Sequence, residues 1–171
     1  MAETGRFDPA AALAALSPAL ALPGQPQALF DAFERLCADS VGHRLFTLLA
    51  WQPDTGEVAR IHSSRPAEYP LRGRKPMGPT EWGARVLHGG QPWLGRNAED
   101  IRWAFPDHAL IASLGCAACM SVPVLWDGRV LGVVAVLDAA GAYDAADLAG
   151  AGLIAPLLVP GFLSVHQQVQ E

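Results

Sequence analysis

The sequence is poor in charge and in cysteine. Charged side chains make up 17% of its 171 residues, and the acidic ones outnumber the basic ones by 17 to 12, which gives a net charge of −5. This shortage of positive charge disfavours binding to nucleic acid or to an anionic membrane, because both need basic patches. Three cysteines, Cys37, Cys116 and Cys119, form no even set of the kind that cross-links small secreted domains.

An uninterrupted apolar run is also missing. The nearest, residues 148–165, is uncharged but contains Pro156, Pro160 and three glycines, so we expect no membrane span. Glu3, Asp8 and several prolines near the N-terminus do not fit a signal peptide, so we interpret it as mature sequence and expect a cytoplasmic location. The chain is long enough for one domain, and its 51% hydrophobic content favours a lined cavity, an oligomer interface, or both.

Residues 114–138 predict a β-hairpin around which the rest of the fold is arranged. Asp127-Gly128 is a dipeptide that tolerates the positive φ angles of a type I′ turn. The run 130–137 is apolar throughout, which predicts a strand covered on both faces and near the middle of a sheet. Pro123 in the preceding run lacks a backbone donor and predicts a sheet edge or a bulge at that point.

A V-P-V step at 122–124, a short turn and the run V-L-G-V-V-A-V-L at 130–137 resemble the closing hairpin of a GAF domain. The resemblance covers residues 26–166. It implies an α/β (α+β) fold with a central antiparallel sheet of five to six strands. The N- and C-terminal helices would cover one face, and the loops and short helices of 65–114 the other. We divide the chain into an N-terminal helix and linker (1–25), a GAF-like domain (26–167) and a tail (168–171).

Local patterns place the remaining elements. Helix signals, such as the Asp8-Pro9 start and the Asn97 and Asp144 caps, predict the helical segments, and β-branched or apolar runs predict the strands. The expected helices cover 9–16, 26–40, 80–87, a stretch from 97, one that ends at 115 and one after 144; the expected strands cover 45–51, 58–63 and 92–95.

The GAF resemblance implies that segments between Tyr69 and Phe105 enclose a ligand cavity, and the many aromatic residues there suit its walls. Cys119 and Ser121 share one face of their strand by period-two alternation and would form the floor. Plain core packing is the alternative for each aromatic residue alone. The candidate ligand-binding residues are Tyr69, Arg72, Arg74, Trp82, Trp93, Trp103, Phe105, His108, Cys119 and Ser121.

Basic residues cluster in the loop that follows the second strand. Five of the twelve lie within residues 60–75. In an acidic protein such clustering suits a carboxylate or phosphate, which arginine binds with two hydrogen bonds. The alternative is a solvated loop whose charges keep an edge strand from aggregating. The five are Arg60, Arg65, Arg72, Arg74 and Lys75.

Cys116 and Cys119 have C-x-x-C spacing. In one strand they would lie about 10 Å apart, too far for a disulfide, so they pair only if Gly115 makes a turn; buried, inert thiols are the alternative. Asp107 and His108 could form an acid–base pair or begin a helix. The segment F-P-D-H also resembles one in free methionine-R-sulfoxide reductases, which are GAF enzymes, but Leu110 and Ile111 stand where that family has its catalytic cysteine.

We therefore predict a sensor module that binds a small organic ligand, with an anionic group as one option, and that forms a homodimer through its terminal helices. The sequence identifies no cofactor, and two late cysteines without a histidine at ligand spacing predict no metal site. The competing hypothesis is a cysteine-dependent enzyme or redox switch that uses Cys116 or Cys119 with His108 and Asp107.

Overall fold

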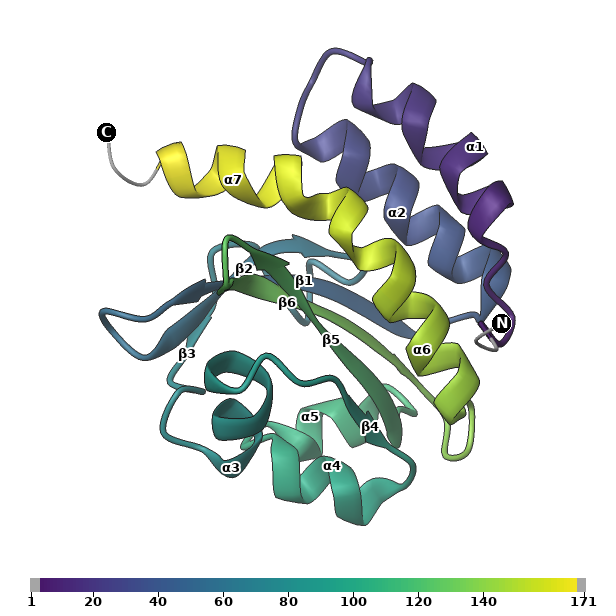
Figure 1. Cartoon of the computed structure of the whole chain (residues 1–171). Coiled ribbons are helices and arrows are strands. Elements are labelled where there is room, and N and C mark those ends of the chain that lie inside the picture. The colour runs from purple at the N-terminus through teal and green to yellow at the C-terminus, as the bar shows by residue number, and fades with distance from the viewer. Residues whose placement is uncertain (1–3, 169–171) are drawn as a thin grey trace.

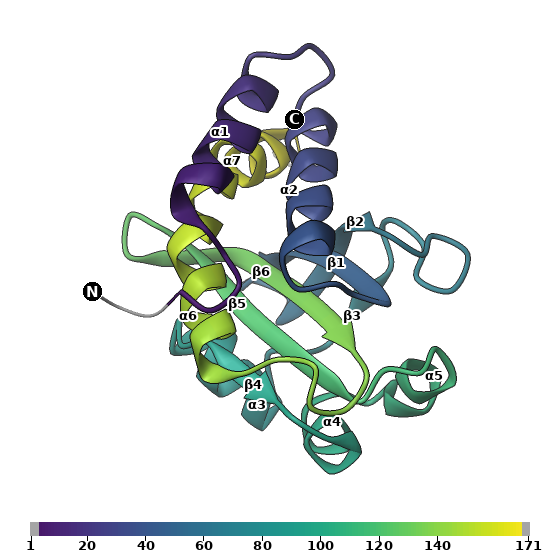
Figure 2. The same cartoon turned by 90° about the vertical axis from the view of Figure 1, so that its right-hand side faces the viewer.

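The computed structural model describes residues 4–168, which form three layers (Figure 1). A six-stranded sheet lies in the middle, long helices cover one face, and short helices and loops cover the other. Figure 2 shows the same layers after a quarter turn, with α1, α2 and α7 on one side of the sheet and α3, α4 and α5 on the other. The α+β class and both coverings are those predicted from the sequence.

The sheet is antiparallel throughout, with the strand order β3-β2-β1-β6-β5-β4. The predicted central strand is therefore central, since β6 pairs on both sides and seven consecutive residues of it are buried. The strands are β1 (Leu45–Gln52), β2 (Glu57–Ser63), β3 (Arg74–Lys75), β4 (Trp93–Gly95), β5 (Ala118–Trp126) and β6 (Arg129–Asp138).

The β5–β6 hairpin confirms the turn and the role of its proline. Asp127 and Gly128 have φ angles of 51° and 69°, the left-handed values that a type I′ turn requires. Strand β4 pairs with β5 only from Cys119 to Ser121, so Pro123 lies beyond its end. The β5–β6 register also shifts between Val124 and Leu125. Pro123 thus stands at a local edge beside a bulge, where a missing donor costs least.

The helical layer consists of the segments at the two ends of the chain. Its apolar core includes the fully buried rings of Phe30, Phe33, Phe46 and Phe162. The last helix is irregular at Pro156, as predicted, because a 3₁₀ segment separates its two α-helical parts. The elements are α1 (Pro9–Leu20), α2 (Gln27–Ser40), α6 (Ala145–Ile154), η2 (Ala155–Leu158) and α7 (Val159–Gln168).

Helix α1 is longer than the sequence predicts and is part of this layer. It runs past Leu16 to Leu20, with Pro18 in its last turn. A proline there costs a hydrogen bond, but Leu16 and Ala19 are buried within the apolar core, and their burial offsets that cost. Of the predicted tail, residues 169–171 lie outside the described residues.

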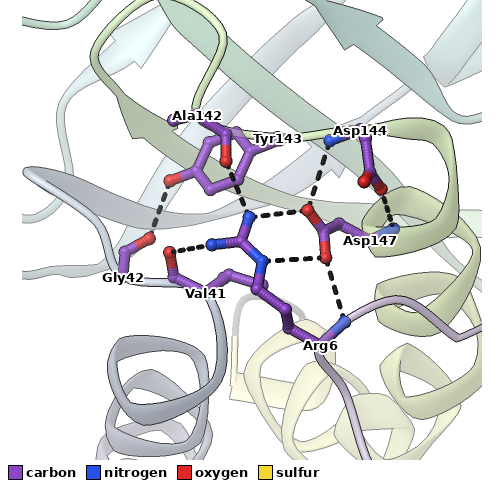
Figure 3. A network of polar contacts seen from close by, with 7 residues as sticks. All are labelled: Arg6, Val41, Gly42, Ala142, Tyr143, Asp144 and Asp147. Atoms are coloured by element: carbon purple, nitrogen blue, oxygen red, sulfur yellow. Dashed lines mark hydrogen bonds and ion pairs between the residues drawn. The ribbon is translucent and has the colours of Figure 1, made fainter.

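An ion pair fastens the segment before α1 to the first turn of α6 (Figure 3). The Arg6 guanidinium donates to both carboxylate oxygens of Asp147, at 3.2 and 2.6 Å, and the Arg6 backbone amide donates as well. Further guanidinium hydrogen bonds reach the carbonyls of Val41 and Ala142. Asp147 also completes a capping box with Asp144. We call this set the Arg6–Asp147 clasp; it joins the N-terminal segment, the end of α2 and the start of α6.

By length and composition alone, the helical segment Ala145–Gln168 could cross a membrane. Core helices of soluble proteins meet the same criterion, and here the segment packs on the sheet, with Phe162 and Leu158 fully buried. The finding is therefore weak grounds for a membrane span.

The third layer contains the short elements between β2 and β5. Thr80 caps a helix as predicted, but the expected α-helix over 80–87 is wrong in detail, because after one α-helical turn the backbone widens into a π-helix that ends at His88. The elements are α3 (Glu81–Gly83), η1 (Ala84–His88), α4 (Ala98–Ala104) and α5 (His108–Ser113).

A bulge in β2 decides which way two polar side chains point. Leu48 pairs with His62 and Leu49 with Arg60, so the ladder skips Ile61. Residues two apart in a strand normally share a face, but the extra residue reverses this relation. His62 therefore meets Gln27 and Glu34 of α2, whereas Arg60 meets Tyr69 and Pro70 beyond the sheet.

Candidate functional site

The aromatic residues predicted to line a cavity do converge on the loop-covered face. Trp82 is fully buried, and its ring lies 5.5 Å from that of Phe105, which lies 5.9 Å from that of Trp93. The Trp82 Nε1 donates to Ser121 Oγ at 3.1 Å, and the Cys119 Sγ lies 3.5 Å from the same oxygen. Cys119 and Ser121 thus share a face as predicted. These side chains fill the space by packing on one another.

Beside these rings lies a group of polar side chains that we call the Asp107 cluster: Arg60, Tyr69, Lys75 and Asp107. The Tyr69 hydroxyl and the Lys75 ammonium both donate to Asp107 Oδ2, each at 2.7 Å. The Arg60 guanidinium lies over the Tyr69 ring, 4.7 Å from its centroid. Lys75 also lies 5.8 Å from the centre of the Phe105 ring, so the cations face aromatic surfaces that attract them.

Backbone pairing holds the cluster in place. The loop after β2 returns along the same strand, where the amides of Arg60 and Arg72 donate to Gly73 O and Arg60 O, both at 2.8 Å. Val58 pairs with Lys75 in β3. Asp107 follows α4 and precedes α5. Four separate segments of the third layer and the sheet edge therefore supply one cluster.

Burial and pairing act in opposite directions on the charges. Burial raises the pKa of Asp107, but the ion pair with Lys75 and the hydrogen bonds from Lys75 and Tyr69 outweigh it and hold this pKa below its usual value. Burial lowers the pKa of Lys75 against the opposing effect of Asp107. Burial also lowers the pKa of Arg60 and raises that of Tyr69. The Asp107 carboxylate is consequently ionised at neutral pH.

Two polar atoms of the cluster are buried without a partner. Within residues 4–168, neither Arg60 Nε nor Asp107 Oδ1 makes a hydrogen bond, although Arg60 is only 5% exposed. Such atoms are uncommon, because each costs about 1–3 kcal/mol. The first is a donor and the second an acceptor. The cluster therefore has one unused hydrogen bond of each kind.

Several predicted site residues lie apart from this cluster. Arg72 and Arg74 are exposed, and Arg74 donates to Gln52 Oε1 at 3.0 Å. Trp103 is 47% exposed, and its ring stacks outside Trp93 at 5.7 Å. Within residues 4–168, Asp107 and His108 make no side-chain hydrogen bond with each other, and Asp107 accepts from Tyr69 and Lys75. Asp107 does stand at the N-cap of α5, but its side chain makes no capping hydrogen bond there.

The two late cysteines lie just after a turn and within a strand. Gly115 has a φ of 79° in the turn that ends α5, and Cys116 directly follows this turn, whereas Cys119 lies within β5. Both are buried free thiols. Burial raises the pKa of Cys116 to about 11 and that of Cys119 to about 12. Because the thiolate is the nucleophile, neither side chain is prepared for catalysis at neutral pH.

Sequence reasoning missed Arg60 and Lys75 as site residues, although it noted both in the basic loop. Two signals were available. Arg60 lies two residues after apolar Val58 in β2, so regular alternation places it on the same face, which carries the loop-side core. Lys75 follows the stretch Arg72-Gly73-Arg74 and precedes buried Met77. Neither signal reveals the contact with Asp107, which is 32 residues further along the chain.

The fold is a three-layer α+β domain with an antiparallel sheet, and comparison with known proteins places it in a family. A GAF domain model matches residues 25–158. The chain therefore belongs to the GAF domain family. Among curated proteins, no sequence matches it.

Solved structures agree on the fold. The GAF domain of a phosphoenolpyruvate-protein phosphotransferase from Coxiella burnetii superposes with a TM-score of 0.71 at 14% identity, over 94% of this chain and 95% of that one. Free methionine-R-sulfoxide reductase from Neisseria meningitidis, in complex with its substrate, gives 0.69 at 18% identity over 92% and 89%. The chromophore-binding domain of a bacteriophytochrome from R. palustris gives 0.66 at 14% identity over 95% and 62%.

Proposed function

We propose that this GAF domain is a sensor module that binds a small organic ligand at the Asp107 cluster. The observation that carries the proposal is the pair of buried atoms without partners, Arg60 Nε and Asp107 Oδ1. A ligand with an acceptor group and a donor group would satisfy both. The aromatic rings of Tyr69, Trp82 and Phe105 would supply apolar walls, as small-molecule sites usually have.

The charges favour one chemical class. The cluster holds two cations, Arg60 and Lys75, against one anion, Asp107, so it carries a positive excess that suits a carboxylate. Asp107 Oδ1 suits an ammonium or hydroxyl donor on the same molecule. Amino acids and hydroxy acids combine these groups at short range, and we expect the ligand among them.

Names of structural neighbours agree with a sensory role. The GAF domain of a two-component sensor histidine kinase from Bacillus halodurans and the chromophore-binding domain of a bacteriophytochrome share this fold. For the present chain, binding would order the 65–80 loop and alter the packing of the terminal helices, which would form the contact of a homodimer. We retain cytoplasmic location and the absence of nucleic-acid and membrane partners as parts of the same proposal.

A thermal-shift screen of amino acids and hydroxy acids tests the site. A ligand of the proposed class should raise the Tm of the wild-type protein, and Asp107→Asn and Arg60→Gln should each reduce its affinity about tenfold or more, the usual effect of losing a charge-assisted hydrogen bond. Glu99→Gln, on the exposed first turn of α4, is the matched control. An unchanged affinity in both cluster variants would contradict this location for the site.

The oligomeric part of the proposal has its own measurement. Light scattering after size exclusion should give twice the monomer mass, and a charge introduced on the exposed surface of the terminal helices, such as Leu153→Asp, should separate the protomers. Leu153 is 58% exposed. A monomeric wild-type protein would refute the homodimer without bearing on the ligand site.

A further inference from the structure

A groove on the opposite face of the sheet lies between α2, α7 and the outer part of β1 and β2. Figure 1 shows α7 extending over this side of the sheet. The groove has a volume of about 510 Å³, which is within the range of small-molecule sites. We call it the helix-face groove. Its lining includes Gln27, Phe30, Ile61, Leu71, Arg72, Arg74 and Val165.

The floor of the groove is apolar and comes from separate elements. Phe30 of α2 is almost fully buried, Ile61 stands at the β2 bulge, and Val165 belongs to α7. At the margin Leu71 is 51% exposed. An exposed leucine beside an apolar floor gives the groove a surface that an aliphatic or aromatic body would cover, with release of water from both.

The charge of the groove is opposite to that of the protein. Its lining contains Arg60, Arg72 and Arg74 and neither aspartate nor glutamate, in a chain whose acidic residues exceed its basic ones by 17 to 12. The Arg60 guanidinium lies over Tyr69 on the other face, so Arg72 and Arg74 supply the charge of the groove. Arg74 is held at the rim by Gln52 at 3.0 Å and Glu57 at 3.5 Å. Within residues 4–168, the Arg72 side chain has no ion-pair or hydrogen-bond partner.

The backbone holds Arg72 in an uncommon conformation. Its φ is 65°, in the left-handed region that costs a side-chain-bearing residue roughly 1 kcal/mol or more. The amide of Arg72 donates to Arg60 O at 2.8 Å, and Gly73 O accepts from Arg60 N at the same distance. These two bonds to β2 fix the backbone from which the Arg72 side chain extends.

We infer that the helix-face groove is a second ligand site, which binds a small organic carboxylate with an aliphatic or aromatic body. The carboxylate lies on Arg72 and Arg74, since guanidinium groups bind it with paired hydrogen bonds. The body covers Phe30, Ile61 and Leu71. The sheet separates this site from Trp82 and Asp107, so the inference does not depend on the function proposed for the Asp107 cluster.

Titration of the full chain with octanoate tests the inference, with backbone amide NMR shifts and calorimetry as readouts. Octanoate should bind with one-to-one saturation and shift the amides of Ala59, Ile61 and Leu71. Octanol keeps the chain but not the charge, and acetate keeps the charge but not the chain. Octanol and acetate should each bind at least about tenfold more weakly than octanoate.

Two variants locate the carboxylate. Arg72→Gln should weaken octanoate binding about tenfold and leave octanol unaffected. Arg72→Gly gives the same loss in a residue that adopts the positive φ without strain, so it serves if the first variant folds poorly. The control is Arg129→Gln, an exposed arginine that lines the hollow near the β5–β6 turn. Arg60 is left unchanged because it also belongs to the Asp107 cluster.

Several results would overturn the inference. They are an absence of octanoate binding, equal binding of octanol, unchanged affinity in both Arg72 variants, and a loss in Arg129→Gln. Shifts confined to Tyr69, Trp82 and Phe105 would also overturn it, because octanoate would then occupy the Asp107 cluster. Conversely, a failure of the Asp107 cluster to bind amino or hydroxy acids leaves the octanoate result unaffected, so the two proposals fail separately.

Discussion

Each face of the sheet buries a carboxylate beside a cationic side chain, but the two carboxylates differ in how many of their oxygens accept hydrogen bonds. On the helix face, Asp147 uses both oxygens, which accept hydrogen bonds from Arg6 and from the amide of Asp144. On the loop face, Asp107 uses one oxygen for both Tyr69 and Lys75 and leaves the other without a partner. A fully bonded carboxylate stabilises the fold, whereas a half-bonded one retains capacity for a ligand.

The largest effect should come from the bonded carboxylate. Asp147→Ala removes four hydrogen bonds, which include the ion pair to Arg6 and half of the capping box, and we expect it to lower the free energy of unfolding by about 2–4 kcal/mol. Urea denaturation gives this value, with Glu99→Ala as an exposed control in the first turn of α4. A loss below roughly 0.5 kcal/mol, the level of ordinary surface substitutions, would show that the clasp is dispensable.

Acid should remove the same contribution. Burial raises the pKa of Asp147, but hydrogen bonds from Arg6 and from backbone amides outweigh it and lower this pKa. A carboxyl whose pKa is lowered in the folded state stabilises the protein fully at pH values above its pKa in the unfolded state, which is about 4. That stability is lost as the pH falls through the folded-state pKa. Below about pH 4, the unfolded-state pKa of an aspartate, the free energy of unfolding of Asp147→Ala should therefore decline less steeply with falling pH than that of the wild type. Parallel curves for the two proteins would contradict this expectation.

Thiol labelling compares how readily the two faces open. Cys37 lies in the helix-face core and Cys119 in the loop-face core, and both are buried with raised thiol pKa values. A ligand site must open locally, so in single-cysteine variants Cys119 should label about tenfold faster than Cys37, a difference of about 1.4 kcal/mol in opening free energy. Both should react slowly in the folded protein. Rapid labelling of Cys119 well below pH 8 would instead support the cysteine-dependent enzyme.

The smallest effect is expected from an apolar replacement of the cluster. Tyr69→Phe combined with Lys75→Met and Asp107→Leu should change the free energy of unfolding by less than about 1 kcal/mol, because apolar residues often replace a buried ion pair without loss. The same variant should lose amino- and hydroxy-acid binding. Urea denaturation measures the first result. A large destabilisation would show that the cluster is structural, like the clasp, and would remove the contrast between the faces.

Local patterns in the sequence sufficed for much of the fold. The Asp127-Gly128 turn, the buried run of β6 and the Asn97 and Asp144 caps each depend on neighbouring residues, and each is present as predicted. The end of α1 and the π-helical turn after Gly83 depend on packing against distant elements, which propensities do not contain. Asp147 was visible as the third residue after the Asp144 cap, but its partner Arg6 is 141 positions away.

The site was predictable only where one strand or one segment contains it. Alternation along β5 sufficed to place Cys119 and Ser121 on one face. The aromatic residues were found by composition, which did not separate buried Trp82 from half-exposed Trp103. The Asp107 cluster combines residues from β2, β3, the loop between them and the start of α5. Their meeting is set by loop geometry, and no spacing in the sequence encodes it.

The bulge at Ile61 has a consequence for comparing this chain with other GAF sequences. An alignment that runs through this position without a gap would assign Arg60 and His62 to the same side of the sheet, because residues two apart in a regular strand share a face. An arginine of the Asp107 cluster would then be compared with residues that face α2, whereas a gap opposite the groove residue Ile61 keeps both neighbours on their observed faces. Deleting Ile61 in the protein would instead restore regular alternation, since Arg60 and His62 would become neighbours and keep the opposite faces that they have now.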